Sequence, residues 1–388
     1  MPPAPFTQGD RVLDNATLRQ TVHVGPGGKR IRLRFSNAFG GADLPVTAVS
    51  VARPAGGKAG VGAIVPGSSR RVTFGGQPGF DIPQGAQAVS DPLDFEVAPG
   101  TNLTVTLYLA HGQASTSITS HPGSRTTSYL LAGDHVDDED LSGATAVDHW
   151  YFLSGLEVWS RRTSSATVVL GDSLSDGRGS TTNGNDRWPD RLRARLAARP
   201  GTADIAVVNE AAGGNRVLRD GLGPNALARL DRDVLARSGV DRLIVFEGVN
   251  DIGTAAPARR TPSGSRPNSS APTGRSSPAP TPRASRSTAP PSPLRRPRLR
   301  RPGSAHESAR RKVNQWIRTG GGFDAVIDFD RAVRDPDAPA DCGRPTTPVT
   351  TSTSTRPVTR RWPTPSRSPF STAERRRRGP GVCRAVPG

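Results

Sequence analysis

Over residues 17–159, apolar and polar positions alternate in short runs that are separated by glycine, proline and aspartate. In the run RIRLRF, Ile31, Leu33 and Phe35 point one way and the arginines the other, which is the period of a half-buried antiparallel strand. Comparable runs follow at short intervals, with hardly a helical pattern among them. The pattern predicts a β-sandwich or jelly-roll-like domain over residues 1–162.

After about residue 163, apolar strand-like runs alternate with amphipathic helix-like runs. The predicted elements are, in order, a strand at 166–170, a helix at 188–199, a strand at 205–209, a helix at 226–238 and a strand at 242–248. This order implies a parallel sheet covered by helices on both faces, with ligands bound at the carboxyl ends of its strands. Ser173, Asn209 and Asn250 each fall at or just after such an end.

Two segments rich in proline, serine, threonine and arginine break this pattern, at 258–304 and 341–388. Neither has the apolar periodicity needed to bury a core, so both are predicted to be disordered. Between them, residues 307–329 predict a helix followed by a strand, which places an interrupted α/β domain at 163–340. The apolar face of this helix consists of Val313, Trp316 and Ile317.

The formal net charge of +18 and the pI near 11.4 indicate, at face value, a nucleic-acid or anionic partner. The segments 258–304 and 341–388 carry +11 and +8, however, which leaves the remaining chain at −1. The only aromatic rings in the tail are those of Trp362 and Phe370, so base stacking has little to act on. We therefore expect no nucleic-acid partner; salt-sensitive DNA binding that disappears when 341–388 is deleted would favour the opposite.

The positions of the cysteines and the lengths of the apolar runs exclude further classes of protein. Cys342 and Cys383 are the only cysteines and both lie in the tail, so the rest of the chain has no disulfide framework and no cysteine metal site. We expect no metal and no cofactor. The first residues lack the basic and apolar regions of an export signal, and no run approaches the roughly 18 apolar residues of a membrane span.

Three short motifs follow the predicted strands in order: GDSL at 171–174, GGNR at 213–216 and GVND at 248–251. An ester-cleaving serine needs a base, a group that orients the base, and donors for the developing oxyanion. Ser173 follows a strand and precedes a loop of small residues, where backbone N–H groups can face its oxygen. The glycines after the second strand let a bare N–H approach a substrate oxygen, and Asn250 offers an amide donor.

The ordered set of motifs resembles the SGNH/GDSL hydrolases, over roughly residues 15–257 and 305–340. The resemblance implies a flavodoxin-like three-layer α/β domain that hydrolyses acyl esters through an acyl-serine intermediate. Ser173 would be the nucleophile, and its N–H, the N–H of Gly214 and the side chain of Asn250 would form the oxyanion hole. Gly214 is preferred to the glycine before it because it directly precedes the Asn-Arg of its motif.

The family's remaining motif, Asp-x-x-His near the C-terminus, is absent from this sequence. His306 is the only histidine after the nucleophile, and it stands where a helix begins, which makes it a poor replacement base. The other histidines precede Ser173 in the β-rich part and are interpreted as surface or strand residues: His23, His111, His121, His135 and His149. The sequence therefore provides a nucleophile and oxyanion donors without an evident base.

A shift of one nucleotide would account for this loss. When the codons of residues 345–362 are read one base out of register, they are compatible with an Asp in the Thr350 slot and a His in the Thr353 slot. The same shift over 276–294 permits a helix end and a buried strand. Our hypothesis is that both low-complexity segments are out-of-frame translations, and a resequenced gene that confirms the written frame would remove it.

Each assignment also has a plainer alternative. Serine is common as a helix N-cap, asparagine followed by aspartate is ordinary turn chemistry, and paired glycines serve tight turns, so Ser173, Asn250, Gly213 and Gly214 could all be structural. Asp172 is interpreted as structural rather than catalytic.

The sequence as a whole predicts an acyl-ester hydrolase that is impaired or inactive as written and acts on a small-molecule, carbohydrate or lipid ester. The alternative is a non-catalytic protein whose β-rich part binds a carbohydrate or a surface and whose α/β part is a degenerate hydrolase. A weaker alternative is a nucleic-acid-associated protein that acts through its basic segments. The β-rich part resembles the accessory domain of secreted family members, which implies an extracellular location, whereas the oligomeric state is left open.

Overall fold

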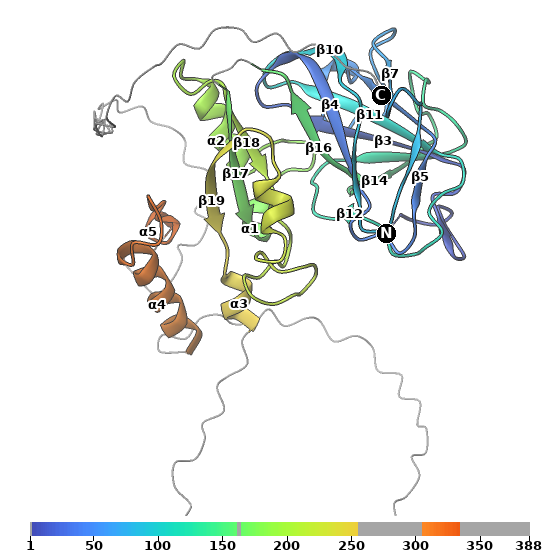
Figure 1. Ribbon diagram of the computed structural model, residues 1–388. Helices are drawn as coiled ribbons and strands as arrows, with labels where there is room; N and C mark the ends of the chain where they lie inside the picture. The colour runs from blue at the N-terminus through green and yellow to red at the C-terminus, as the bar shows by residue number, and fades with distance from the viewer. Residues whose placement is uncertain (1, 161–163, 255–304, 334–388) are drawn as a thin grey trace, which may run out of the picture. The chain divides into compact units, whose positions relative to one another are not determined.

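The computed structural model describes residues 2–160, 164–254 and 305–333 (Figure 1). Contacts between residues divide the chain into two units, Met1–Val326 and Ile327–Gly388. The segments for which the sequence predicts disorder, 258–304 and 341–388, lie outside the described residues. Both cysteines lie there as well.

The larger sheet of the β-rich part is antiparallel and has six strands in the order β14-β13-β3-β11-β6-β7. Their bounds, in that order, are Thr145–Val147, Ser128–Ala132, Ala16–His23, Asn102–Leu109, Ala48–Ala52 and Arg70–Val72. The central strands β3 and β11 pair over their whole length. Arg19 of β3 is fully buried, and its guanidinium donates hydrogen bonds to the carbonyls of Gly62 and Asp138, so loops cover one face of this sheet.

A second antiparallel sheet has β4 between β10 and β16, and β9 also pairs with β4. The bounds of β4, β10, β16 and β9 are Gly28–Ser36, Leu93–Val97, Leu153–Val158 and Gln87–Val89. Ile31, Leu33 and Phe35 of β4 are buried, as their alternation predicts. One hydrophobic core contains buried residues from both sheets.

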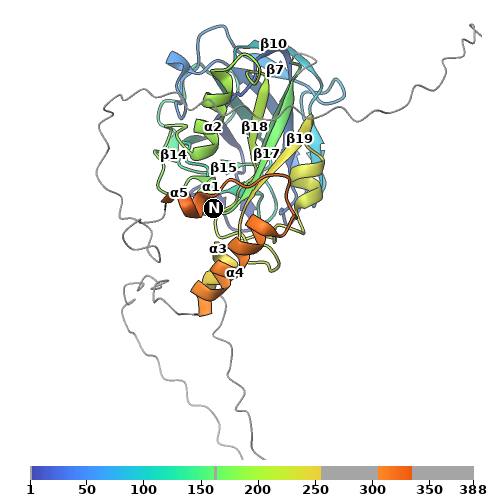
Figure 2. The same ribbon diagram turned by 90° about the vertical axis from the view of Figure 1, so that its left-hand side faces the viewer.

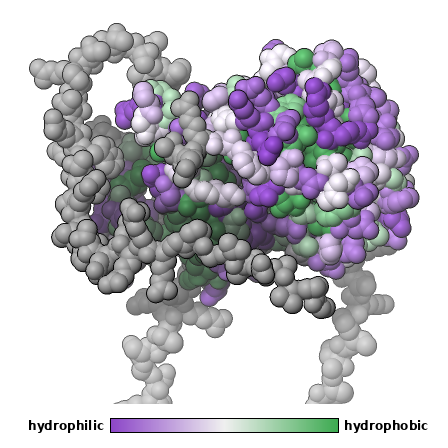
Figure 3. Space-filling view, turned by 45° about the horizontal axis from the view of Figure 1, so that its top comes forward, coloured by the Kyte–Doolittle hydropathy of each residue, from purple (hydrophilic) through white to green (hydrophobic). Residues whose placement is uncertain are grey.

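Several pairs of very short strands lie between the main strands of the β-rich part. Hydrophilic side chains cover much of the face drawn in Figure 3. The short elements are β1 (Thr7–Gln8) with β2 (Arg11–Val12), β5 (Leu44–Val46) with β8 (Phe80–Ile82), β12 (Ser120–His121) with β15 (Trp150–Tyr151), and the 3₁₀ turn η1 (Ala55–Gly57).

The strands after residue 163 form a parallel sheet in the order β18-β17-β19, with bounds Ile205–Asn209, Ser165–Gly171 and Val240–Phe246. Figures 1 and 2 show β17 between its two neighbours. The three strands predicted between residues 163 and 254 are present and parallel, so the prediction of a mixed α/β chain is confirmed. Val168 and Val169 of β17 are fully buried, as expected for a central strand.

Three helices follow these strands: α1 (Ser173–Asp176), α2 (Trp188–Ala197) and α3 (Val249–Thr254). Pro189 stands in the first turn of α2, where its missing N–H costs nothing, and the Asp190 carboxylate accepts a hydrogen bond from the N–H of Arg187. Leu192 and Leu196 are half-buried, as their spacing predicts, but Arg193 is the more deeply buried residue. Within the described residues, no helix is long and apolar enough to cross a membrane.

The helix predicted at 226–238 is wrong in form. The structure has only a short π-helical turn there, η2 (Asp231–Leu235), in which a charged and an apolar side chain, Asp233 and Val234, are buried. Arg229 and Asp233 are buried, whereas Leu227 and Leu235 are 58% and 64% exposed. Ala226 and Val234 of this run do face the core, so only part of the apolar pattern read from the sequence turns inward.

The helix predicted between the two low-complexity segments is present as α4 (Ala305–Thr319), but the strand expected after it is absent from the described residues. Ile327 is 57% exposed, and the next element is a short helix, α5 (Phe329–Val333). No described residue of α4 is buried, and Trp316 is 54% exposed and packs on Phe323. A strand needs a neighbour for its backbone hydrogen bonds, and no described strand pairs with this stretch.

Candidate active site

The three motifs lie at one edge of the parallel sheet. Gly171, the last residue of β17, is in register with Phe246, the last residue of β19, and Asn209 ends β18 opposite Val169. The carboxyl ends of all three strands therefore meet, as the alternation of strands and helices predicts. The segments that begin at Asp172, Glu210 and Glu247 emerge together.

Ser173 is the first residue of α1, directly after β17. The helix is capped by Asp172, whose carboxylate accepts a hydrogen bond from the N–H of Leu174 at 2.9 Å. The alternative in which Ser173 itself is the N-cap is therefore wrong, and Asp172 has the structural role expected of it. Ser173 is half-buried, and within the described residues its N–H makes no hydrogen bond.

Gly214 has a backbone conformation that favours glycine, with φ +75°. A Cβ at this position would lie 2.7 Å from Leu222 Cδ1, whereas at Gly213 it would lie 3.5 Å from an oxygen of Asp176. No described residue accepts a hydrogen bond from the Gly214 N–H. The structure thus distinguishes the two glycines: Gly214 has the special backbone, and Gly213 is the neighbour of α1.

Asn250 lies in α3, and its side-chain amide donates a hydrogen bond to the carbonyl of Asn215 at 2.8 Å. Asp251 accepts hydrogen bonds from the N–H of Val217 at 2.9 Å and 3.1 Å. These two residues fix the loop that carries the second motif to the helix that carries the third. One N–H of the Asn250 amide is left for another acceptor.

Arg229 joins all three motif segments, and sequence reasoning missed it. Its guanidinium donates hydrogen bonds to Gly171 O at 3.3 Å and to Asn215 Oδ1 at 2.7 Å. It also pairs with Asp233 at 3.1 Å and lies 3.7 Å from Glu247 Oε1. The side chain is 4% exposed, and a planar fork with several donors can hold several acceptors at fixed spacing. The signal available in the sequence was an arginine inside a leucine-rich run.

Two glutamates at the strand ends have raised pKa values; the side chain of Glu247 is 1% exposed and that of Glu210 is 16% exposed. Burial raises the pKa of Glu247 to about 7, with the charge of Asp172 adding to the rise. Burial likewise raises the pKa of Glu210 to about 7, although Arg237, 2.8 Å away, opposes the rise. Burial also raises the pKa of Asp172. Burial therefore disfavours the charged form of these three carboxyl groups.

The structure brings one histidine to α1. His121 of β12 lies with Nε2 2.7 Å from Asp176 Oδ1, a pairing for which the sequence offered no signal. His306 is the second residue of α4, and the Thr350 and Thr353 slots lie outside the described residues. No group of His, Cys, Asp and Glu that could hold a metal ion occurs in the part of the chain that the structure describes.

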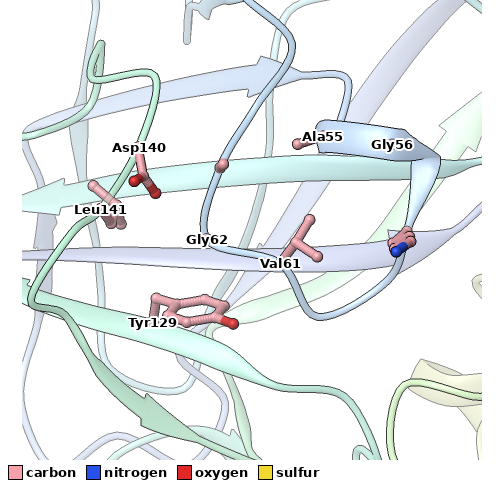
Figure 4. A pocket seen from close by; sticks show the side chains of 9 residues that line it. Ala55, Gly56, Val61, Gly62, Tyr129, Asp140 and Leu141 are labelled. Atoms are coloured by element: carbon pink, nitrogen blue, oxygen red, sulfur yellow. The ribbon is translucent and has the colours of Figure 1, made fainter.

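A shallow pocket opens elsewhere, on the β-rich part (Figure 4). The ring of Tyr129 and the side chains of Leu141 and Asp140 line it, together with the loop over residues 55–63. Tyr129 is held in place because its hydroxyl donates a hydrogen bond to Gly60 O at 2.9 Å. None of the lining residues belongs to the three motifs.

Comparisons with known proteins give one family match and several distant structural ones. Residues 169–346 match the model of the GDSL-like Lipase/Acylhydrolase family. No match is found among curated proteins.

Among solved structures, an active site mutant of a family two carbohydrate esterase from Clostridium thermocellum is 12% identical, covering 61% of this chain and 67% of its own, with a TM-score of 0.19. A family two carbohydrate esterase from the same organism in complex with cellohexaose is 13% identical, with coverages of 60% and 63% and a TM-score of 0.19. One from Cellvibrio japonicus is also 13% identical, with coverages of 63% and 64% and a TM-score of 0.19.

The chain thus spans about two thirds of the length of these structures. The family assignment rests on the match to the family model, which contains all three motifs. The similarity to the GDSL-like lipase/acylhydrolase family is thus shown for residues 169–346, under half of the chain.

Proposed function

We propose that this protein is a serine ester hydrolase with Ser173 as its nucleophile. One observation carries the proposal: the three motif segments meet at one edge of the parallel sheet, where the N–H groups of Ser173 and Gly214 are unbonded within the described residues. Together with the second N–H of the Asn250 amide, they are three donors for the oxygen of a tetrahedral intermediate. Arg229 holds the segments that carry them.

The reaction is acyl transfer to Ser173 Oγ, followed by hydrolysis of the acyl-serine by water. The family's Asp-x-x-His motif is missing from the written sequence, and we attribute its loss to a frameshift that hides it behind Thr350 and Thr353. Hydrolysis by the chain as written is therefore impaired. Oxyanion donors and substrate binding alone leave roughly 10³-fold acceleration over water in other serine hydrolases.

The finer architecture follows the same proposal. The strand order β18-β17-β19 is how a flavodoxin-like sheet begins, and residues 258–304 would supply its next strand in the restored frame. The two antiparallel sheets that share a core act as a β-sandwich accessory domain. The substrate is an ester of a small molecule, sugar or lipid, met outside the cell, and no cofactor takes part.

Hydrolysis of p-nitrophenyl acetate tests the proposal on three proteins: the chain as written, its Ser173→Ala variant and the frame-restored chain. We expect strong hydrolysis by the restored chain, weak hydrolysis by the chain as written, and none above background after Ser173→Ala in either. A restored chain without activity, or a rate that is independent of Ser173, contradicts the proposal.

The pocket of Figure 4 favours a second candidate function, the binding of a carbohydrate by the β-rich part. An aromatic ring beside a carboxylate is suited to an apolar sugar face and its hydroxyls, and Tyr129 and Asp140 supply both. Calorimetric titration with soluble oligosaccharides decides it. Binding that Tyr129→Ala removes and Ser173→Ala leaves intact would favour a binding module.

A further inference from the structure

His121 of the β-rich part meets the helix that carries the nucleophile. Its Nε2 lies 2.7 Å from Asp176 Oδ1, and the side chains of His121 and Asp176 are 34% and 9% exposed. Asp176 follows Ser173 by three residues on α1, and residues at that spacing lie on the same helix face, about 5–6 Å apart at Cβ. The imidazole of His121 therefore contacts the helix that begins with Ser173, three residues from it along the chain.

The position of His121 is fixed from both sides. In its own part of the chain, β12 pairs with β15, which sets His121 opposite Trp150. Toward the α/β part, Asn183 donates from its backbone to Arg125 O at 2.9 Å and accepts from the N–H of Thr127 at 2.8 Å. The segment that carries His121 is thus bonded to the loop after α1.

Close approach at this point depends on a glycine. A Cβ at Gly123 would lie 2.1 Å from Asp176 Oδ2, so only glycine lets the backbone come this near to the carboxylate. The same carboxylate lies beside Gly213, the first residue of the second motif. Asp176 of the nucleophile's helix is therefore close both to His121 and to the loop of the second motif.

The pairing also sets the chemistry of the ring. Because a carboxylate can only accept, the hydrogen bond to Asp176 places a proton on Nε2 and leaves Nδ1 of the neutral ring as an acceptor. No other hydrogen bond to this ring occurs among the described residues. The charged groups that face it are Asp176 on α1 and, after β18, Glu210, which is itself paired with Arg237 at 2.8 Å.

We propose that His121 is the base for Ser173 in this chain and that Asp176 orients it. The inference rests on the proposed function of Ser173 and names the group that function lacks. Nδ1 accepts the hydroxyl proton as Oγ bonds to the acyl carbon, directly or through one water. The imidazolium returns this proton to the leaving alkoxide as the ester C–O bond breaks, and water then cleaves the acyl-serine by the same route.

The test compares variants of the full chain as written, by Ser173-dependent p-nitrophenyl acetate hydrolysis and by labelling of Ser173 with a fluorophosphonate. His121→Gln keeps a donor toward Asp176 but cannot accept a proton, and Asp176→Asn removes the orienting charge. We expect each to lower both rates at least about 10-fold, because general bases contribute 10²-fold or more. Added imidazole should restore part of the rate of His121→Gly, which a purely structural histidine would not allow.

The matched control is His135→Gln. His135 pairs with Asp138 at the same 2.7 Å, but in a loop between β13 and β14. We expect its rates to stay within about twofold of the parent chain, in line with a site remote from the reacting atoms. Thermal unfolding of every variant shows whether a lost rate reflects a lost fold.

The outcomes separate this inference from the proposed function. If His121→Gln keeps the parent rates, or if the chain as written shows no Ser173-dependent rate while the frame-restored chain is active, His121 is not the base and the hydrolase function stands. If the restored chain is inactive too, the proposed function fails. If His121→Gln does not fold, Asp176→Asn and imidazole rescue of His121→Gly decide between the same alternatives.

Discussion

The β-rich part and the α/β part bury their side chains very differently. In the β-rich part, one core contains residues from both large sheets, and Leu33 and Phe35 are 1% and 0% exposed. In the α/β part the core cluster consists of four buried residues, Val168, Leu170, Ala226 and Val234. Much of what is buried there instead is charged, including Arg229 and Asp233. The first part is stabilised by apolar packing, and the second relies on ion pairs at the strand ends.

The weak apolar packing of the α/β part also shows in the exposed residues of β19. Leu243 and Val245 are each 42% exposed, although strands of a parallel sheet are normally buried on both faces. No described strand pairs with the free edge of β19, and the segment that the frameshift hypothesis would turn into a strand lies outside the described residues. Among the described strands β19 is therefore an edge strand, and Leu243 and Val245 stay near water.

The largest effect is expected from Arg229→Met in the α/β part. The change leaves Glu247 without its cation and removes the donors to Gly171 O and Asn215 Oδ1. Removal of one partner from a buried charge network costs about 3–5 kcal/mol. Denaturant unfolding should show this loss, whereas Arg195→Met, on the exposed face of α2, should stay within about 0.5 kcal/mol. Equal stability of the two variants would refute a structural role for the ion pairs.

A leucine-to-alanine change in each part compares how much apolar packing contributes to the free energy of unfolding. Leu33→Ala in β4 should lower the free energy of unfolding by about 3 kcal/mol, because Leu33 is 1% exposed and the cavity cannot fill with water. Leu243→Ala in β19 should cost less than about 1 kcal/mol, because Leu243 is already 42% exposed. Similar losses for both would mean that β19 is covered in solution by a part of the chain or a partner that the structure does not describe.

Sequence patterns predicted those features that depend on neighbouring residues. The alternation around Ile31, Leu33 and Phe35 sets a strand locally, and the motif that contains Ser173 follows its strand directly. The contacts of His121 with Asp176 and of Arg229 with Gly171 join residues 55 and 58 positions apart, and no local period reports them. The roles of Ser173, Gly214 and Asn250 stay predictions.

The two wrong elements failed for the same kind of reason. The run at 226–238 has a leucine pattern typical of a helix, but buried hydrogen bonds from Arg229 decide which face turns inward. The run around Ile327 has a strand-like pattern, but a strand forms only beside another strand. Both outcomes depend on partners that are distant in the sequence.

Carboxyl groups in the two parts should respond to pH with opposite signs. Burial raises the pKa of Glu247 to about 7, so the native state binds more protons than the unfolded chain between about pH 4.5 and 7. Its contribution is fully present below the unfolded pKa and is lost as the pH rises through 7. Glu247→Gln should therefore gain stability relative to the parent chain between pH 5 and pH 8, measured by denaturant unfolding at both values.

Glu157 in β16 is the matched case in the β-rich part. Burial alone would raise its pKa, but hydrogen bonds from Arg32 and Arg34 outweigh burial and lower it. Its contribution is present above the unfolded pKa and is lost as the pH falls through the folded pKa. Glu157→Gln should therefore cost stability at pH 7 and little in acid. If both glutamine variants shift with pH in the same direction, the electrostatic contrast between the two parts is wrong.

The smallest expected effect comes from the paired glycines of the second motif. Gly214→Ala forces a side chain onto a backbone with φ +75°, which costs about 1 kcal/mol, whereas the exposed Leu222 can move away from the new Cβ. Gly213→Ala has ordinary φ and 3.5 Å to its nearest neighbour, so its unfolding free energy should change by less than about 0.5 kcal/mol. Unfolding of both variants, with p-nitrophenyl acetate rates in the frame-restored chain, separates backbone strain from oxyanion binding. A rate that falls at Gly214→Ala far more than its stability does would support the Gly214 N–H as a donor, and a larger rate loss at Gly213→Ala would transfer that role to Gly213.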